Sequence, residues 1–321
     1  MSSAAMPPTQ NSVLVIAGPT ASGKTALALE LAERLGGVVI NADSMQVYRE
    51  LRILTDRPSP QDEARVPHRL FGVLPAAERG SAAWWRDAAS AEIDAVLAAG
   101  QVPILCGGTG LYLNALMQGI AEVPPVPSAV VEAAVARYRA LGGGAFKEEV
   151  RSLDPVLGER LEPGDSQRLQ RAWAVATATG RALSDWQAQP TGGRDDLSFC
   201  RVLLFPPRPV SAEAVEVRFR KMIDEGAVDE VRRLAALGLD RSLPAMRAIG
   251  VPQLVDYIDG KIELDAAVEA SVIATRQYAK RQRTWFRHQF LSDIRMDAQF
   301  SKSSFEEIFS EIRSRLLTPP S

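Results

Sequence analysis

A phosphate-binding loop near the N-terminus constrains the fold of this chain more than any other sequence feature. Residues 18–25 read GPTASGKT and match the pattern G-x-x-x-x-G-K-[ST] at every defined position. Backbone N–H groups of such a loop point at phosphate oxygens, the lysine adds a positive charge, and the final hydroxyl suits Mg²⁺. We therefore expect a di- or triphosphate to bind Gly18, Pro19, Thr20, Ala21, Ser22, Gly23, Lys24 and Thr25, with Thr25 at the metal.

The segments around this loop predict a parallel β-sheet. An apolar run at residues 13–16 precedes the loop, and Leu27, Ala28, Leu31 and Leu35 follow at helical spacing. Further apolar runs at 38–41, 102–106 and 201–205 predict core strands, and apolar residues from Val215 to Leu234 predict a long helix. The expected fold class is α/β, a P-loop NTPase-like parallel sheet flanked by helices. Open sheets of this kind bind ligands at the carboxyl ends of their strands.

A stretch of different character interrupts the predicted core. Pro124, Pro125 and Pro127 precede it, residues 190–193 (PTGG) follow it, and helical spacing dominates between them. We expect residues 12–125 and 199–316 to form the catalytic core, residues 126–198 to form an inserted all-helical lobe, and residues 1–11 to be a disordered tail.

Composition limits the classes of function. The chain has 321 residues, of which 46% are hydrophobic, with two cysteines and two histidines. These counts suit a globular protein with a sizeable core and argue against a disulfide framework or a Cys/His zinc module. Residues 1–11 have neither the basic region nor the apolar stretch of a signal peptide, so we expect no membrane association and a cytoplasmic location. With a net charge of −2, nucleic-acid binding would need local basic patches.

Three polar residues follow the predicted strands or occupy the predicted long helix. Asp43 suits a general base or a water-mediated Mg²⁺ ligand, but with Gln46 three residues later it also fits a capping box. Thr109, after two glycines, fits either a helix cap or a ligand contact. Arg218 fits a solvated helix face or a contact to a departing diphosphate. Spacing alone leaves each pair of interpretations open.

Two further sets of polar residues have helical spacing. Uniform positive charge along one helix face favours an anionic partner such as nucleic acid, although a solvated face explains it equally well. This stripe consists of Arg276, Lys280, Arg283 and Arg287. In the inserted lobe, hydrogen-bonding side chains suit phosphates and base edges, or an exposed helix face. These are Gln167, Arg168, Gln170 and Arg171.

Taken together, the motifs resemble the tRNA dimethylallyltransferase family, also called tRNA isopentenyltransferases, in its bacterial type. The resemblance covers nearly the whole chain. Its segments are GPTASGKT at 18–25, NADSMQVYR at 41–49, GGTGLY at 107–112, GDSQRLQRA at 164–172, the Arg218 region, AMRAIG at 245–250 and TRQYAKRQRTWFR at 275–287. The Asp-Ser-Met-Gln segment followed by the C-terminal Arg-Gln, Lys-Arg-Gln and Trp-Phe-Arg run is the most specific part.

The resemblance implies a reaction and a role for each motif. The family transfers the dimethylallyl group of dimethylallyl diphosphate to N6 of adenine 37, beside the anticodon of tRNA. It implies Asp43 as the general base, Thr109 and Arg218 at the diphosphate, and Mg²⁺ held partly by Thr25. An extruded adenine would lie among Asp43, Ser44, Met45, Gln46 and Thr109. The anticodon stem-loop would contact residues 167–171, namely Gln167, Arg168, Leu169, Gln170 and Arg171, and the stripe Arg276, Lys280, Arg283 and Arg287. The chain would act as a monomer.

Three competing functions fit the phosphate loop. A small-molecule phosphotransferase would bind ATP and use Asp43 to activate an acceptor hydroxyl. A related prenyltransferase would modify free adenosine nucleotides, which leaves the helical lobe and the basic stripe without a role. A non-catalytic RNA-binding regulator would use the nucleotide as a switch.

Overall fold

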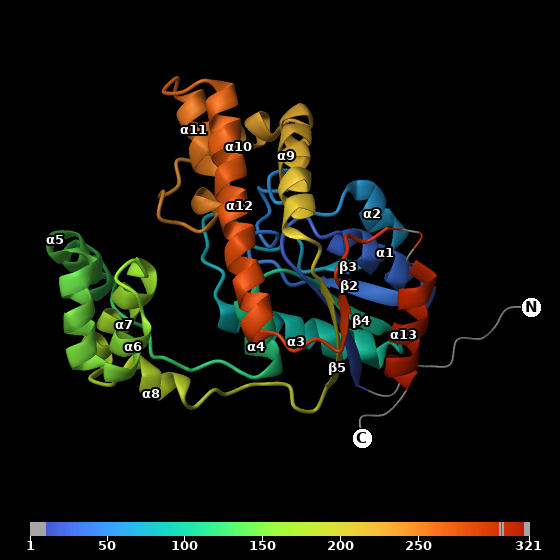
Figure 1. Cartoon of the computed structure of the whole chain (residues 1–321), viewed down its shortest axis with the longest axis horizontal. Helices are drawn as coiled ribbons and strands as arrows, with labels where there is room; N and C mark the ends of the chain where they lie inside the picture. Colours follow the sequence, from blue (N-terminus) through green and yellow to red (C-terminus); the bar gives the residue numbers. More distant parts are fainter. Residues whose placement is uncertain (1–10, 302, 304, 318–321) are drawn as a thin grey trace, which may run out of the picture. The chain divides into compact units, whose positions relative to one another are not determined.

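A computed structural model describes residues 11–301, 303 and 305–317 of the chain. Of the disordered tail expected over residues 1–11, all but Asn11 lies outside the described residues. The chain divides into two compact units, one formed by the residues up to Leu113 and from Asp195 onward, the other by Asn114–Arg194 (Figure 1).

The first unit is built on a six-stranded parallel sheet with strand order β3-β2-β4-β1-β5-β6. The strands are β1 (Ser12–Ala17), β2 (Gly37–Asn41), β3 (His68–Arg69), β4 (Val102–Gly107), β5 (Ser198–Leu204) and β6 (Ile294–Met296). The four apolar runs of the sequence are therefore strands, and the predicted fold class is confirmed. The strands β2, β3 and β4 lie on one side of β1, and β5 and β6 lie on the other, so the strand order switches sides at β1. Folds of this kind bind ligands at the carboxyl end of the strands beside such a switch.

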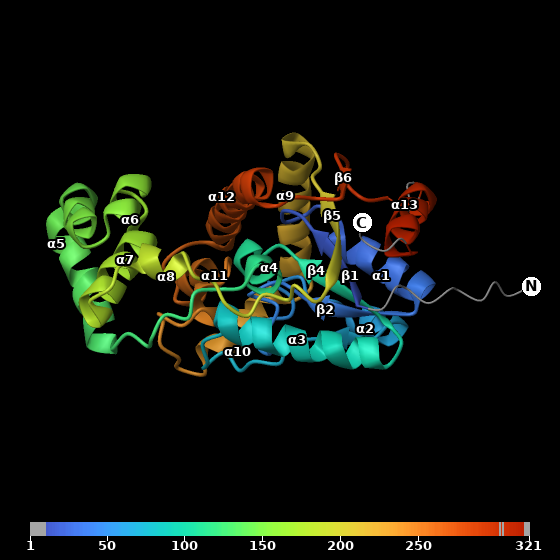
Figure 2. The same ribbon diagram turned by 90° about the horizontal axis from the view of Figure 1, so that it is seen from below.

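Helices cover both faces of the sheet (Figure 2). On one face, α1 (Lys24–Leu35) and α13 (Phe305–Leu317) pack on the inward side chains of β1, β4 and β5. On the other face lies α3 (Ala82–Ala98), whose Trp85 is fully buried and donates Nε1–H to the Asn41 carbonyl at 2.8 Å. Two short helices add to these layers. α2 (Pro60–Arg65) lies beside α1, where Arg65 pairs with Glu30 (3.3 Å) and Glu33 (2.8 Å), and α4 (Gly110–Met117) lies beside α3, where Tyr112 stacks on Trp85. Burial of both faces explains why the strands read as continuous apolar runs.

A bundle of helices follows β5. It contains α9 (Arg208–Asp224), α10 (Ala227–Ala235), the 3₁₀ turn η1 (Ala245–Arg247), α11 (Val251–Ile258) and α12 (Leu264–Gln289). The single long helix expected from Val215 to Leu234 is wrong, because Gly226 at φ 98° separates α9 from α10. Glycine adopts this left-handed conformation without steric cost, so the apolar pattern continues across a break.

The second unit is all-helical and has its own core. It contains α5 (Ser128–Leu153), α6 (Pro155–Arg160), α7 (Ser166–Thr179) and α8 (Leu183–Gln187), with α5 kinked at Gly142. Buried Asp154 joins three of these helices, since it caps α6 through Leu157 N (2.9 Å) and accepts from Ser184 N (2.9 Å). An antiparallel bridge between Ile120 and Thr191 pairs the incoming and outgoing segments.

Candidate active site

The phosphate loop adopts a conformation that depends on its glycines. A Cβ on Gly18 would lie 2.3 Å from the Leu204 carbonyl oxygen, and Gly23 has φ 89°. The Lys24 ammonium donates to the Pro19 carbonyl at 2.9 Å. The Ser22 hydroxyl is buried without a hydrogen-bond partner among the described residues. A buried hydroxyl of this kind is costly unless a ligand pairs with it, so the loop is suited to receive an anion.

Titratable residues from three other segments act on the pKa of Lys24. Burial lowers the pKa of the Lys24 ammonium, and Arg218 lowers it further, while Cys106, Asp43 and Asp56 raise it. Desolvation is the largest of these effects. The structure therefore brings Asp43 and Arg218, predicted from separate segments, into the electrostatic environment of the loop lysine.

Asp43 and Thr109 belong to one hydrogen-bonded corner at the ends of β2 and β4. Asn41 holds the backbone of Asp43 by accepting from its N–H (2.8 Å) and donating to its carbonyl (3.0 Å). The Thr109 hydroxyl accepts from Ser44 N at 2.9 Å and donates to Ser44 Oγ at 3.3 Å. Gly107 allows this approach, because a Cβ there would lie 2.2 Å from the Ala42 carbonyl.

This corner resolves two alternatives that spacing left open. Asp43 accepts from Met45 N (2.9 Å) in a turn, and no helix begins there, so the helix-cap interpretation is wrong. The Thr109 hydroxyl bonds to Ser44 rather than capping α4, which begins at Gly110. Both side chains lie instead where the strand ends meet the phosphate loop.

Two residues of α12 complete the site, and sequence reasoning did not single them out as site residues. Gln282 is 6% exposed, accepts from Thr20 N (2.8 Å) and Thr20 Oγ1 (3.1 Å), and donates to the Gly108 carbonyl (2.9 Å). Burial and the charge of Asp43 raise the pKa of the Tyr278 phenol, while hydrogen bonding to Thr109 opposes this. A polar residue within the buried stripe of α12 was the available signal for Gln282.

Thr55 and Asp56, in the segment after β2, bind the side chains of Gln46 and Arg218. Gln46 Nε2 donates to the carbonyls of Thr55 (2.8 Å) and Asp56 (2.9 Å), so its amide N–H groups bond to the protein. Arg218 pairs with Asp56 at 2.9 Å. Arg218 is therefore held by a partly exposed ion pair, and its contact to a departing diphosphate stays a prediction. Met45 is partly buried in the same turn.

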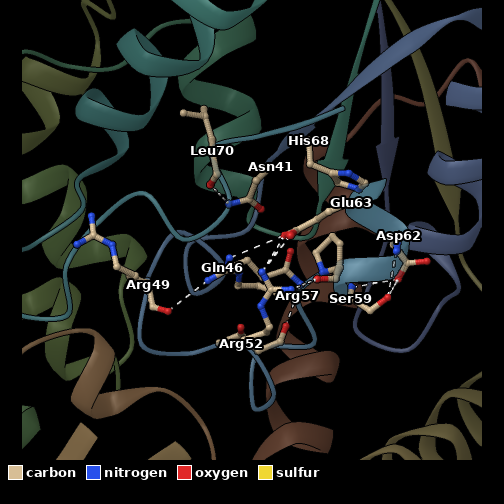
Figure 3. A network of polar contacts seen from close by, with 12 residues as sticks. Asn41, Gln46, Arg49, Arg52, Arg57, Ser59, Asp62, Glu63, His68 and Leu70 are labelled. Atoms are coloured by element: carbon tan, nitrogen blue, oxygen red, sulfur yellow. Dashed lines mark hydrogen bonds and ion pairs between the residues drawn. The ribbon is translucent and has the colours of Figure 1, made fainter. Parts of the chain in front are cut away.

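The loop from Arg52 to Pro58 is anchored on both sides. Glu230 of α10, only 4% exposed, accepts from the backbone N–H groups of Arg52 (2.8 Å), Ile53 (2.8 Å) and Leu54 (2.9 Å). Arg52 binds Glu63 with both carboxylate oxygens at 3.0 Å, and Arg57 lies 4.0 Å from the same group (Figure 3). These contacts fix the position of Asp56 and, through it, the free end of Arg218.

The basic stripe of α12 separates into different environments. Arg276 pairs with Glu216 of α9 at 2.9 Å, and Arg283 donates to the Pro206 carbonyl at 2.6 Å. Lys280 and Arg287 are exposed and have no ion pair within the described part of the chain. The stripe is therefore not a uniformly free surface, because two of its four cations bind protein groups.

The polar cluster predicted in the second unit lies on α7. Gln167, Arg168 and Arg171 are exposed and Gln170 is partly buried. Leu169 is 0% exposed and packs in the core of this unit. The expectation that its side chain binds RNA is wrong, since the helix periodicity that exposes its neighbours turns Leu169 inward.

Among the described residues, no group of three or more His, Cys, Asp or Glu side chains is arranged to hold a metal ion. No helix within the described ranges is long and apolar enough to cross a membrane. Both cysteines are buried and free.

Comparison with known proteins identifies the family. A family model described as IPP transferase matches residues 46–289, and one described as isopentenyl transferase matches residues 11–72. The tRNA dimethylallyltransferase of Rhodospirillum centenum is 53% identical over 90% of this chain and 93% of its own length. That of Paramagnetospirillum magneticum is 48% identical over 98% and 100%.

A solved structure agrees with these relatives. The full-length tRNA isopentenylpyrophosphate transferase of Bacillus halodurans superposes with a TM-score of 0.67 at 30% identity, covering 95% of this chain and 97% of that one. The chain therefore belongs to the tRNA dimethylallyltransferase family of enzymes.

Proposed function

We propose that this enzyme transfers the dimethylallyl group of dimethylallyl diphosphate to N6 of adenine 37 in tRNA and releases diphosphate. The observation that carries the proposal is the convergence of the phosphate loop, Asp43 and Arg218. Gln282 bonds to both Thr20 and Gly108, and Thr109 bonds to Ser44 beside Asp43. Gln46 bonds to the carbonyl of Asp56, whose side chain pairs with Arg218. Family membership supports these substrates, and the positions of these groups support the roles proposed below.

The donor is held by its anionic end. Breaking the allylic C–O bond leaves negative charge on the diphosphate, which the loop N–H groups, Lys24 and Arg218 stabilise. The unpaired Ser22 hydroxyl offers one more donor. Thr109 contacts the diphosphate from the end of β4. Arg218 reaches the diphosphate by exchanging its ion pair with Asp56 for phosphate oxygens.

The acceptor adenine enters from the corner formed by β2 and β4. Its N6 forms a bond to the first carbon of the allyl group as the C–O bond breaks, and Asp43 takes the N6 proton. A base must leave its stack to reach such a site, so residues 43–46 and Thr109 surround an extruded adenine. One acid/base group of this kind contributes about 10²–10⁴-fold to the rate.

The site suits Mg²⁺ that arrives with the diphosphate. Mg²⁺ is commonly held by one or two protein oxygens together with substrate phosphates, and the Thr25 hydroxyl is such an oxygen. When bound, the ion would neutralise charge on the diphosphate.

The remaining basic and polar residues bind the tRNA. We assign the lobe expected over residues 126–198 to the anticodon loop, through the exposed Gln167, Arg168 and Arg171 and the partly buried Gln170. The α12 residues Arg276, Lys280, Arg283 and Arg287 contact the backbone. With tRNA as its substrate, the protein would work in the cytoplasm, and we propose that it acts as a monomer.

Mass spectrometry of tRNA nucleosides tests the proposal. Purified protein, labelled dimethylallyl diphosphate and tRNA should yield adenosine with a dimethylallyl increment, while labelled ATP should give no transfer and AMP should not compete. Asp43→Asn keeps the acceptor for Met45 N but removes the base, so transfer should fall about 10²–10⁴-fold with tRNA binding retained. Undiminished turnover by this variant would refute the role of Asp43.

A further inference from the structure

Four arginines from three elements gather beside the phosphate loop, and two of them stack on the ring of Phe205. Phe205 follows β5 directly, Arg208 is the first residue of α9, Arg283 belongs to α12, and Arg295 lies in β6, paired in register with Leu203. The guanidinium carbons of Arg283 and Arg295 lie 4.1 and 4.7 Å from the centre of the Phe205 ring. The fourth member, Arg287, is one helical turn beyond Arg283.

These arginines are close enough to repel one another. Burial lowers the pKa of Arg283, and Arg287, Arg208 and Arg295 lower it further, while Asp297 raises it. Arg295 pairs with Asp297 at 2.9 Å, but Arg208 and Arg287 are exposed and have no hydrogen bond or ion pair to the described residues. No side chain caps the N-terminus of the 17-residue helix α9, so the positive end of its dipole adds to the same field.

A cluster of like charges on a chain with a net charge of −2 is a local feature rather than a consequence of composition. Folding brings the charges together against their mutual repulsion, which an anionic partner would relieve. Phe205, on which Arg283 and Arg295 stack, directly follows Leu204, whose carbonyl lies against Gly18, so the cluster borders the phosphate loop on the β5 side. The planar guanidinium fork suits phosphate oxygens.

We propose that Arg208, Arg283, Arg287 and Arg295, here called the Phe205 arginine cluster, bind the phosphodiester backbone of the tRNA whose adenine enters the site. The proposal rests on the proposed function for the identity of its partner. It adds Arg208 and Arg295 to the RNA surface and replaces a stripe along one helix by a cluster across α9, α12 and β6. A free diphosphate is the smaller alternative, and the phosphate loop already supplies the donors that it needs.

The test uses three cluster variants: Arg208→Gln, Arg287→Gln and the double variant that combines them. The control is Arg220→Gln. Arg220 is an exposed residue of the same helix as Arg208, so its variant loses equal charge outside the cluster. tRNA binding is measured by fluorescence anisotropy between 50 and 300 mM KCl. Each cluster variant should bind about three- to tenfold more weakly at 150 mM, and the slope of log K against log salt should fall by about 0.7–0.9 per arginine.

The control and the donor kinetics decide between explanations. Arg220→Gln should keep the wild-type slope, and KM for dimethylallyl diphosphate should be unchanged in all variants. Equal slopes of log K against log salt for the double variant and Arg220→Gln would refute tRNA binding by the cluster. A wild-type protein that does not bind tRNA would refute it as well. A raised KM for the donor with unchanged tRNA affinity would assign it to diphosphate instead. If the cluster variants lose tRNA affinity but wild-type protein forms no dimethylallyladenosine, the proposed function fails and the cluster stands.

Discussion

Replacing Gln282 by methionine removes the side chain that joins α12 to both the phosphate loop and the end of β4. Methionine has a similar length and no amide, so the change deletes hydrogen bonds with little change in volume. The deleted bonds are those with Thr20 N, Thr20 Oγ1 and the Gly108 carbonyl, at 2.8, 3.1 and 2.9 Å. The Thr20 hydroxyl can rotate to another partner, but the two backbone groups cannot.

The expected cost follows from those two backbone groups. An unsatisfied buried donor or acceptor costs about 1–3 kcal/mol, so the variant should lose about 2–6 kcal/mol of unfolding free energy. Any movement of the phosphate loop that exposes Thr20 N to water would reduce the loss toward the lower value. Such movement would also displace the loop from the diphosphate, so stability and donor binding should both suffer.

Urea unfolding and donor kinetics measure the two effects. The midpoint of unfolding should fall in Gln282→Met, and KM for dimethylallyl diphosphate should rise. Gln289→Met is the matched control, because Gln289 is an exposed residue of the same helix without a partner in the described chain, and its change should stay within about 0.5 kcal/mol. An unfolding midpoint and KM equal to those of the wild type would show that this bridge does not support the loop.

Three further outcomes are expected. Burial holds the pKa of Lys24 below its unfolded value, so burying the charged ammonium costs stability at every pH below the folded pKa, and this cost disappears as pH rises to the unfolded pKa. Lys24→Met should therefore raise the melting temperature at pH 7 and abolish donor binding. A lower melting temperature would contradict this. Glu230→Gln should lower the free energy of unfolding in urea by about 1–3 kcal/mol, because one amide oxygen replaces a carboxylate that accepts three backbone N–H groups. The variant should also slow transfer by loosening the Asp56–Arg218 pair. An unchanged unfolding midpoint would show that the loop does not need this anchor. Burial raises the pKa of Cys106 and of Cys200 to about 11. Iodoacetamide at pH 8 should therefore label neither thiol in the native protein and both thiols in urea, as measured by mass spectrometry. Rapid labelling of the native protein would show that the thiols are not buried in this way.

The sheet and the phosphate loop could be predicted because their signals are local. Each of the four central strands β2, β4, β1 and β5 contains a run of buried apolar residues, and the loop needs glycines at positions that the chain itself specifies. The short edge strands β3 and β6 lack such a run and were not predicted. The helix break at Gly226 was missed because the apolar spacing on its two sides stays in phase. Leu169 was assigned with its polar neighbours, although its position on α7 faces the core of the second unit.

The role of a polar residue was harder to predict than its presence. Asp43 and Thr109 each fitted a helix cap as well as a site, because both positions follow a strand end. Their hydrogen bonds to Met45 and Ser44 distinguish these interpretations, and the Ser44–Thr109 bond joins segments 65 residues apart. Similarly, the partner of Arg218 is Asp56, which no spacing within α9 could reveal.

The sequence by itself determined the four central strands, the phosphate loop and the family, because these depend on residue types at fixed short spacings, whereas the edge strands β3 and β6 came only from the tertiary structure. Only the tertiary structure decided which polar residues share the site and which arginines share a surface. Hydrogen bonds and charge repulsion act over a few ångströms of space, whatever the separation along the chain. Gln282 therefore belongs with Thr20, and Arg208 with Arg283 and Arg295, through the folding of elements that are distant in sequence.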